Sequence, residues 1–504
     1  MKKYAWIGLI LMCLYAQGQQ ITFDTRKTFQ TMHSFGASDC WSMAIIGKNY
    51  PASKKNQIAE WLFSQEVDAQ GNPKGIGLSL WRFNIGAGSF EQGQTSKISN
   101  EWRRAESFLT GNTYDWEKQK GQQYFLDAAK KNGVPYTLGF LNSSPVQMTQ
   151  NGLAIGSGKL AEWNFNKDKI DAWTDFITTV SSHFQFTYLS PFNEPQWDWG
   201  PGKSGEASQE GTPINNVDLA WATRKLAQKF QQTNTKTRIV IPEAGQLNYL
   251  VDTKSNRPGQ DVQIDDFFST NSPNYLGNEP IVEKVIAGHS YFTTSPTSRR
   301  VALRQAVGKK AQEAQINYWQ SEFCILGDNA GEIKGNGVDL GMKTALYVAK
   351  VIHADIHDAN ATSWSWWLAV SANDFKDGLI YTFNGGTKGE NNANKFDAEL
   401  YDSKTLWALG NYARFIRPGM KRFEVSIQQP DCLITGFTDQ KSNVFVLVNA
   451  GNAFEMNWPS QHEIKTYTTT EHQNLAFQSV RDGKIQVPSA SIITLVYSSN
   501  KLFN

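Results

Sequence analysis

The sequence predicts an α/β fold, namely a (β/α)8 or TIM barrel with an appended antiparallel β-sandwich domain. Eight short apolar segments alternate with helix-like segments between residues 31 and 413, and only short strand-like runs follow. The 504 residues also exceed the roughly 250 that such a barrel needs. We therefore divide the chain into a signal peptide (1–18), a barrel (31–413) and a side domain made of residues 19–30 and 414–504.

The barrel prediction rests on strands and helices that follow one another along the chain. The strand candidates are residues 33–38, 76–84, 135–141, 186–192, 239–242, 285–291, 316–322 and 361–367. Apolar residues recur with the helical period at 53–63, 171–184, 216–230 and 341–354. Strands that alternate with helices in this way are typical of a parallel sheet built from βα units.

The side domain is predicted from a change of pattern after residues 414–419. No long amphipathic helix follows, and turn residues separate short alternating runs at 432–437, 444–449, 464–468, 485–487 and 492–497. Residues 20–24 can add a strand to this set, so the domain draws on both ends of the chain. Short strands between turns are typical of a small antiparallel sandwich.

The N-terminus has the layout of a secretory signal peptide. Lys2 and Lys3 precede an apolar run over 6–15 that is too short to span a bilayer, and Gly18 marks the expected cleavage region. Cys13 raises the alternative of a lipid anchor, but Met12 stands where a lipoprotein signal requires a small residue. We expect a secreted or periplasmic protein.

Composition excludes several classes of function. The net charge of +2 does not indicate binding to nucleic acid or to an anionic membrane. After cleavage three cysteines remain, so at least one thiol is unpaired and disulfides are not the basis of stability. The 17 Trp, 17 Tyr and 29 Phe fit a packed core, but flat rings also provide surfaces on which sugars stack.

Two strand candidates end in a glutamate. Glu194 follows the strand 186–192 directly before Pro195, which cannot continue a β-ladder, and Glu322 ends the strand 316–322. Barrels of this type carry their active sites at the C-terminal ends of the strands. Strands four and seven lie across the barrel mouth, so both carboxyls can enter one cleft. Cleavage of a glycosidic bond needs such a pair, one carboxyl protonated and the other ionised.

Neighbouring residues can adjust the two carboxyls. Arg82 can hold Glu322 ionised, Tyr291 can donate a hydrogen bond to it, and Asn193 can shape the surroundings of Glu194. Glu243 is a third strand-end carboxylate that either binds a sugar hydroxyl or supports a loop. Candidates for sugar stacking, with core packing as the alternative, are Trp41, Trp197, Trp199, Trp364 and Trp366.

Three other motifs favour structural interpretations. His353 and His357 have helical spacing, but Ala354 stands where a zinc protease carries Glu. Residues 200–204 resemble a phosphate loop, but Trp197 replaces its first glycine, and residues 85–88 lack the third glycine of a dinucleotide-binding loop. We therefore expect no cofactor and no metal ion.

These residues together resemble glycoside hydrolase family 30, a family of retaining (β/α)8 hydrolases. The resemblance implies that Glu194 is the acid/base, that Glu322 is the nucleophile and that a sandwich packs on the barrel. It implies substrate-binding roles for Arg82, Asn193, His289, Tyr291, Trp41, Asn142, Trp364 and Trp366. The motifs are 35–38 (FGAS), 82–89 (RFNIGAGS), 142–145 (NSSP), 192–195 (FNEP), His289-x-Tyr291, Ser321-Glu322, 364–367 (WSWW) and 414–419 (RFIRPG).

Within the family, residues 38–41 (SDCW) and 195–199 (PQWDW) are most similar to bacterial endo-β-1,6-galactanases. The expected partner is a polysaccharide, cleaved with retention of configuration by a monomer. The alternatives are an endo-xylanase, a β-1,6-glucanase or an exo-acting β-glycosidase with the same two glutamates. A noncatalytic carbohydrate-binding protein on this scaffold is the alternative from a different class.

Overall fold

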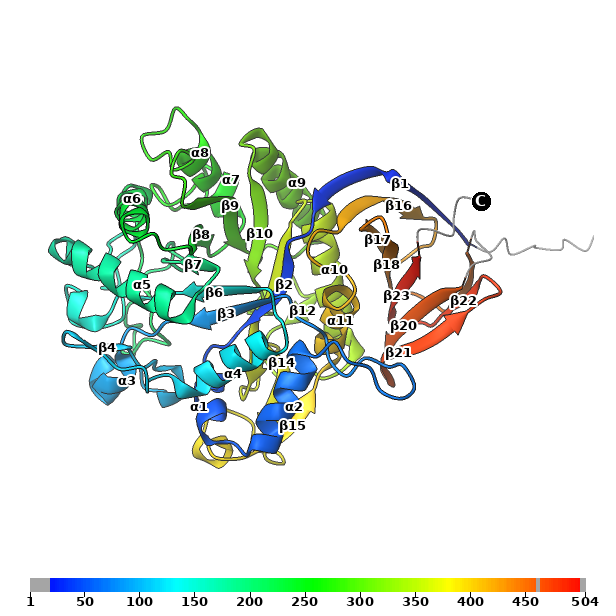
Figure 1. Ribbon diagram of the computed structural model, residues 1–504, viewed down its shortest axis with the longest axis horizontal. Helices are drawn as coiled ribbons and strands as arrows, with labels where there is room; N and C mark the ends of the chain where they lie inside the picture. Colours follow the sequence, from blue (N-terminus) through cyan, green and yellow to red (C-terminus); the bar gives the residue numbers. More distant parts are fainter. Residues whose placement is uncertain (1–18, 459–462, 499–504) are drawn as a thin grey trace, which may run out of the picture.

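The computed structural model describes residues 19–458 and 463–498. The signal peptide predicted for residues 1–18 lies outside the described residues. Two parts are evident, a barrel surrounded by helices and a smaller β-domain against one side of it (Figure 1).

Eight parallel strands close into a barrel, as the sequence predicted. Hydrogen bonding joins neighbouring strands around the ring, and β13 pairs with both β10 and β2 to close it. In ring order the strands are β2 (Ser34–Ser38), β3 (Leu80–Asn84), β6 (Tyr136–Phe140), β7 (Tyr188–Ser190), β8 (Arg238–Ala244), β9 (Val282–His289), β10 (Asn317–Glu322) and β13 (Ser363–Ser371). Two further strands, β14 (Gly378–Phe383) and β15 (Glu399–Asp402), continue the sheet outside the ring from β13.

Helices surround the barrel, and half of the longer ones match predicted segments. These are α2 (Ala52–Phe63), α5 (Ile170–Phe184), α6 (Asn216–Gln232) and α10 (Met342–His357). The helices α1 (Ser42–Asn49), α4 (Lys120–Lys131), α9 (Thr297–Glu313) and α11 (Lys404–Ala413) were not predicted. The pattern in α9 is obscured because its buried face includes Arg300 and Arg304, which break the apolar period.

Short elements lie in the connections between these helices and strands. They are α3 (Ser89–Gln92), α7 (Asn248–Val251), α8 (Gln263–Phe268), β4 (Leu109–Thr110), β5 (Thr113–Tyr114), β11 (Asp328–Asn329), β12 (Ile333–Lys334) and five single-turn 3-10 helices. The 3-10 helices are Gly93–Ser96, Glu101–Arg103, Val146–Met148, Lys167–Lys169 and Asn392–Asn394.

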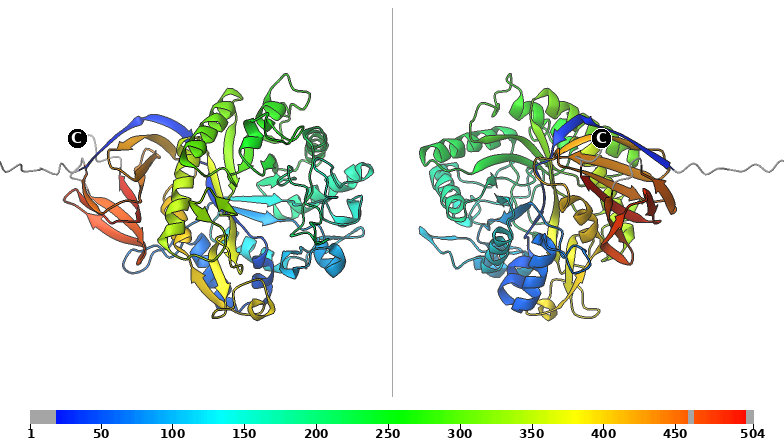
Figure 2. Two further views of the ribbon diagram at one scale, coloured as in Figure 1. Left: turned by 180° about the vertical axis from the view of Figure 1, so that it is seen from behind. Right: turned by 45° about the vertical axis from the view of Figure 1, so that its right-hand side comes forward.

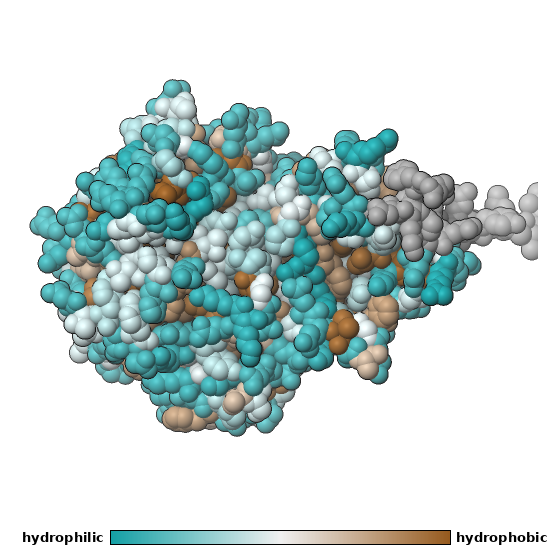
Figure 3. Space-filling view, in the orientation of Figure 1, coloured by the Kyte–Doolittle hydropathy of each residue, from teal (hydrophilic) through white to brown (hydrophobic). Residues whose placement is uncertain are grey.

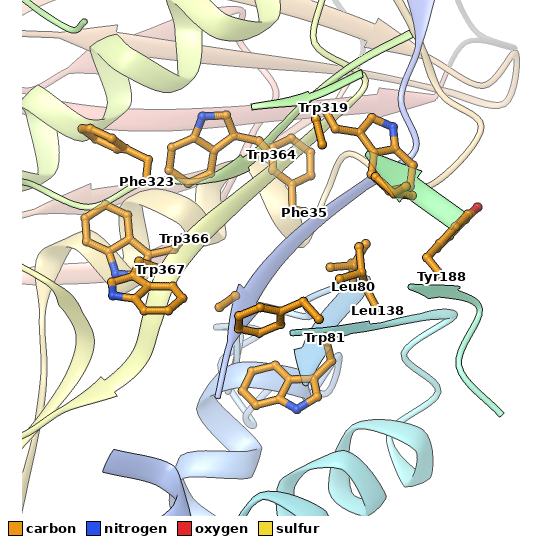
Figure 4. Packing of buried hydrophobic residues seen from close by; sticks show 14 of the residues in the cluster. Phe35, Leu80, Trp81, Leu138, Tyr188, Trp319, Phe323, Trp364, Trp366 and Trp367 are labelled. Atoms are coloured by element: carbon orange, nitrogen blue, oxygen red, sulfur yellow. The ribbon is translucent and has the colours of Figure 1, made fainter. Parts of the chain in front are cut away.

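An aromatic cluster fills the N-terminal end of the barrel. The ring of His33 stacks on Tyr136 with centroids 4.1 Å apart, and it lies 4.6 Å from Trp319. His33 Nε2 also lies 2.9 Å from the hydroxyl of Tyr188. Trp319 and Tyr188 of this cluster are among the buried rings labelled in Figure 4.

The β-domain is a nine-stranded arrangement that includes the first described strand. Its order is β21-β20-β23-β18-β17-β16-β1-β19-β22, antiparallel except where β1 meets β19. The strands are β1 (Gln19–Thr31), β16 (Lys421–Ile427), β17 (Cys432–Thr438), β18 (Ser442–Asn449), β19 (Phe454–Asn457), β20 (Ile464–Thr470), β21 (Gln473–Val480), β22 (Lys484–Val487) and β23 (Ser491–Ser498). Three of them, β16, β19 and β21, were not predicted, although Phe423, Val425 and Ile427 of β16 alternate with polar residues.

The large sheet of this domain buries both of its faces. Along β18, Val444, Val446 and Val448 belong to the core shared with the barrel, whereas Phe445 and Leu447 belong to the core of the β-domain. Successive side chains of a strand point to opposite faces, so one strand serves two cores. The rotated views show the β-domain against one side of the barrel (Figure 2), where α10 and α11 contact it.

A buried amide joins the barrel to the β-domain. Asn411 of α11 donates from Nδ2 to the carbonyl of Tyr467 (3.0 Å) and to Thr494 Oγ1 (2.9 Å), and it accepts a hydrogen bond from Thr469 Oγ1 (2.7 Å). Asn411, Thr469 and Thr494 are all fully buried, so water cannot replace these partners.

Replacing Asn411 by alanine is expected to lower the free energy of unfolding by about 2–4 kcal/mol, because it leaves buried hydrogen-bonding groups unpaired. Urea denaturation followed by circular dichroism measures the change. Gln232→Ala, at the exposed end of α6, is the control and should change stability by less than about 0.5 kcal/mol. Equal stability of the two variants would contradict the proposal that the hydrogen bonds of Asn411 hold the barrel and the β-domain together.

The visible surface of the barrel is mostly hydrophilic, with hydrophobic residues in small separate groups (Figure 3). Within residues 19–458 and 463–498, no helix is long and apolar enough to cross a membrane. Cys40, Cys324 and Cys432 all carry free thiols, in line with the expectation that packing rather than disulfides stabilises the fold.

Candidate active site

A cavity of about 470 Å³ opens at the C-terminal ends of the barrel strands. Glu194 follows β7, Tyr291 follows β9 and Glu322 ends β10, so three different strands bring polar groups to it. The full lining is Trp41, Arg103, Asn193, Glu194, Trp197, Trp199, Ser208, Gln209, Tyr291, Phe292, Glu322, Leu326, Trp367, Phe375 and Asp377. This is the position where barrels of this type carry their chemistry.

The backbone of Glu194 is fixed by three hydrogen bonds. Its N–H donates to the carbonyl of Glu243 (2.8 Å), and its own carbonyl accepts from Trp197 N (3.2 Å) and Trp199 Nε1 (3.0 Å). Glu194 has a φ of 46°, a left-handed conformation that residues other than glycine seldom adopt. These contacts hold its carboxyl toward the cavity.

Glu322 is directed into the site by an irregularity at the end of β10. Gln320 pairs with Gly288 and Glu322 with His289, so Ser321 is an extra residue relative to β9. Such a bulge changes the direction of the side chains that follow it. The carboxylate of Glu322 accepts hydrogen bonds from Arg82 Nη1 (2.8 Å) and the Tyr291 hydroxyl (2.9 Å). Both donors fix the position of this carboxylate, and one of them is charged.

His289 joins three carboxyl groups. Its Nδ1 lies 2.9 Å from Glu194 Oε1 and 3.6 Å from Glu322 Oε1, and its Nε2 lies 3.1 Å from Glu243 Oε2. Glu194, His289 and Glu322 each contribute an atom to a group whose members all lie within 4.8 Å of one another. The two glutamates singled out by the sequence therefore face one another in a single cavity.

The surroundings shift the pKa values of Glu194, Glu243 and His289 in different directions. Burial raises the pKa of Glu194, although its hydrogen bond with His289 opposes this shift. Burial also acts on Glu243, but the charge of Arg82 and the hydrogen bond from His289 lower its pKa to about 2. Burial disfavours charged His289, yet the negative charge of Glu322 and hydrogen bonds with Glu194 and Glu243 raise its pKa to about 10.

A metal ion is not needed to balance these charges. The group formed by Glu194, His289 and Glu322 is compact enough to hold a cation. However, the guanidinium of Arg82 contacts Glu322 at 2.8 Å and Glu243 at 3.7 Å, and protonated His289 supplies a second positive charge. A further cation would meet both of these groups at short range.

Most of the predicted site residues lie together. Arg82, His289 and Tyr291 contact the two glutamates directly, and Asn193 and Trp41 line the cavity. Trp197 and Trp199 line it as well. Asn142 does not line the cavity. It is buried, and its Oδ1 has no hydrogen-bond partner among the described residues.

The prediction that Trp364 and Trp366 bind substrate needs correction. Their exposed fractions are 0% and 1%, and their indole N–H groups donate to Asp355 Oδ2 (3.0 Å) and to the carbonyl of Asp377 (2.7 Å). Both rings pack around Phe323 within the core (Figure 4). Alternation along β13 places these two side chains on the outer face of the barrel, where no sugar can reach them.

The residue of this strand that lines the cavity is Trp367, which was not predicted. Its ring meets Trp41 edge to face, with centroids 5.2 Å apart, and the guanidinium of Arg103 lies 4.7 Å from the Trp41 ring. Because side chains alternate between the two faces of a strand, Trp367 lies on the same face as Ser363 and Ser365, and the sequence alone therefore indicated which tryptophan faces the cavity. The lining residues Ser208, Gln209, Phe292, Leu326, Phe375 and Asp377 come from loops, and Arg103 ends a 3-10 helix within a connection, so periodicity does not place them.

Comparison with solved structures supports the same architecture. A conserved exported protein from Bacteroides fragilis is 31% identical, with a TM-score of 0.87, over 95% of this chain and 100% of that one. The catalytic domain of xylanase C from Talaromyces cellulolyticus, of glycoside hydrolase family 30, is 19% identical, with a TM-score of 0.67, over 94% and 99% of the two chains. An endo-β-1,6-glucanase is 14% identical, with a TM-score of 0.62, over 95% and 93%. At these lower identities the likeness shows the fold alone.

The family itself is shown by the sequence. The model of O-glycosyl hydrolase family 30 matches residues 18–381, which include all eight barrel strands and both cavity glutamates. Together with a closed barrel and paired carboxyls at its C-terminal end, this match establishes that the chain is a glycoside hydrolase belonging to O-glycosyl hydrolase family 30.

Proposed function

We propose that the protein cleaves β-glycosidic bonds by double displacement, with Glu322 as the nucleophile and Glu194 as the acid/base. One observation carries this proposal, namely that the two carboxyls meet within 4.8 Å in one cavity but have different surroundings. Arg82 and Tyr291 stabilise the charge of Glu322, whereas burial favours a protonated Glu194. A retaining hydrolase requires this pair, with the carboxyls about 5–5.5 Å apart.

In the first step a Glu322 oxygen attacks the anomeric carbon while the bond to the leaving oxygen breaks. Glu194 donates its proton to that oxygen, and an ester between sugar and Glu322 results. In the second step the ionised Glu194 removes a proton from water. The resulting hydroxide attacks the anomeric carbon, breaks the ester and restores both side chains, with net retention of configuration.

For the substrate we propose a β-1,6-linked galactan, cut at internal bonds. The residues that suggested this branch, Trp41, Trp197 and Trp199, line the cavity, where flat rings can stack on sugar faces. Xylan and β-1,6-glucan are the alternatives, and structures of similar fold include a xylanase and an endo-β-1,6-glucanase. An exo-acting β-glycosidase would use the same two glutamates.

Product analysis tests this assignment. The purified protein is incubated with β-1,6-galactan, xylan and β-1,6-glucan, and the products are separated by size. Mixed internal fragments from galactan alone support the proposal. Monomers or dimers alone would indicate exo action. Fragments from another polymer would identify that polymer as the substrate in place of galactan. Proton NMR of the first-formed anomer tests retention, and a first product of inverted configuration would refute double displacement.

An exposed ring at the cavity wall gives a sharper test of polysaccharide binding. Phe375 is 37% exposed and lines the cavity. Phe375→Ala should raise KM for the polysaccharide about tenfold, with kcat within about twofold, because a binding contact common to ground and transition states is lost. Phe396→Ala, which removes a ring that is 66% exposed outside this cavity, is the control and should leave KM unchanged. Equal KM values for the two variants would exclude stacking on Phe375.

We also propose that the chain is exported through the N-terminal signal predicted above. The similar protein from Bacteroides fragilis is described as exported, which supports this proposal. Mass spectrometry of protein secreted by an expressing bacterium should give an N-terminus at or near Gln19. An intact Met1 or a lipid-modified Cys13 would contradict it.

A further inference from the structure

We propose that Glu243 is a positioning residue whose negative charge keeps His289 protonated and thereby assigns the remaining proton of the site to Glu194. The proposal rests on the function proposed above for Glu194 and Glu322. We use "the five-residue cluster" for Arg82, Glu194, Glu243, His289 and Glu322. The sequence left open whether Glu243 binds sugar or supports structure, and the contacts within this cluster favour a third role.

Glu243 lies below the cavity and cannot touch a substrate. Its exposed fraction is 0%, and it is not among the residues that line the cavity. Oε1 accepts a hydrogen bond from Ser190 Oγ (2.6 Å), and Oε2 accepts one from Ser321 Oγ and lies 3.1 Å from His289 Nε2. Arg82 Nη2 lies 3.7 Å from Oε2. The carboxylate therefore contacts both cations of the five-residue cluster.

The backbone of Glu243 is also coupled to the acid/base. Pro242 pairs with Ala287 and Ala244 with Gly288, so Glu243 is an extra residue in β8, with a left-handed φ of 59°. A residue with a β-carbon keeps this strained conformation only where its surroundings enforce it. The carbonyl of Glu243 accepts the hydrogen bond from Glu194 N (2.8 Å), so one residue contacts Glu194 through its backbone and His289 through its side chain.

The charges of the five-residue cluster balance only if Glu243 is included. With Glu194 protonated, the anions Glu243 and Glu322 face the cations Arg82 and His289. After Glu322 forms its ester it loses its charge, and ionised Glu194 then restores the balance. A buried net charge is costly, so the balance favours a proton on Glu194 before the first step and its absence after it.

Other titratable groups near the five-residue cluster leave this balance intact. They are Asp39, Cys40, Tyr249, Tyr291 and Cys324, and burial raises the pKa of each. The thiols and phenols are ordinarily neutral at neutral pH, so a raised pKa keeps them neutral. Asp39 accepts hydrogen bonds from Asn84 N and Gln122 Nε2, and among the residues the structure describes it forms no ion pair with Arg82.

Replacing Glu243 by glutamine tests the charge while keeping the shape. Without this anion the five-residue cluster carries an excess positive charge when His289 and Glu194 are both protonated, so this hydrogen-bonded pair should release a proton more easily. The alkaline limb of the pH profile of kcat/KM should move to lower pH by about one unit or more. Glu243→Asp keeps the charge, so its alkaline limb should lie nearer the wild-type one. Glu283→Gln is the matched control. Glu283 lies at the opposite end of β9 from His289, so this variant should not move the alkaline limb.

An unchanged alkaline limb in folded Glu243→Gln would overturn the proposal, as would equal shifts in Glu243→Gln and Glu243→Asp. Circular dichroism establishes folding. If Glu243→Gln does not fold, ¹⁵N NMR of wild-type His289 decides, because the proposal requires a cationic ring at pH 8 and a neutral ring would refute it. This spectrum does not depend on catalysis. If Glu322→Gln keeps its activity, the proposed function fails, whereas a neutral His289 in an enzyme that needs both glutamates defeats the role of Glu243 alone.

Discussion

Glu322→Gln is expected to lower kcat by at least about 10⁴-fold, because no other group can form the ester with the anomeric carbon. The amide has the same shape, but it cannot act as the nucleophile and bears no charge for Arg82 to hold. Binding of polysaccharide should persist, since the cavity wall is unchanged. Initial rates on the polysaccharide and isothermal titration with an oligosaccharide measure the two effects separately.

The matched control for this variant is Glu332→Gln, which changes an exposed glutamate in a loop and should keep wild-type kcat. Residual activity of Glu322→Gln above about 1% of wild type, in protein free of deamidated material, would remove Glu322 as the nucleophile. Binding with unchanged affinity in wild type and variant, but no turnover by either protein, would favour the noncatalytic carbohydrate-binding alternative within this family.

Glu194→Gln is expected to show a loss that depends on the leaving group. General acid catalysis contributes about 10²–10⁴-fold, and it matters most when the departing oxygen is a poor leaving group. The polysaccharide rate should fall by about 10³-fold, whereas the burst of phenol release from a dinitrophenyl glycoside should change by less than about tenfold. Stopped-flow absorbance measures the burst, which isolates the first step.

Azide provides the complementary test of the second step. Water needs Glu194 as a base, but azide is a nucleophile that needs none, so azide should accelerate turnover of Glu194→Gln on the activated glycoside and yield a β-glycosyl azide. The wild-type enzyme should not be accelerated. Equal losses on good and poor leaving groups, or an α-glycosyl azide, would show that Glu194 is not the acid/base of a retaining mechanism.

The sequence predicts the strands of the barrel better than its helices, for a physical reason. Buried parallel strands are apolar on both faces and stand out as short runs, so β8 was found within a few residues. By contrast, α9 hides its period because it buries Arg304 in an ion pair with Asp355 at 2.7 Å. That ion pair joins two different helices, α9 and α10, so no local sequence pattern indicates it.

The residues of the site divide in the same way, into those with a local signal in the sequence and those whose role depends on distant residues. Strand ends revealed Glu194 and Glu322, because a predicted strand that stops at a carboxylate is a local signal. The role of Glu243 was left open, since its meaning depends on Ser190, Ser321 and His289 from three other strands. The resemblance implied substrate contacts for Trp364 and Trp366, but the face of the strand decides which ring meets the cavity, and both of these rings are buried on the other face.

The pairing of β1 with β16 has a consequence for how the chain folds. Ile21 pairs with Ile427 and Thr31 with Lys421, so two segments separated by nearly the whole barrel lie in one sheet. Contacts this distant in sequence close late, because the entropy lost in joining them grows with the length of the loop between them. A chain emerging from a ribosome or a translocon must therefore keep β1 unpaired until β16 arrives. During that interval β1 presents an open strand edge, which makes chaperone protection most valuable before synthesis is complete.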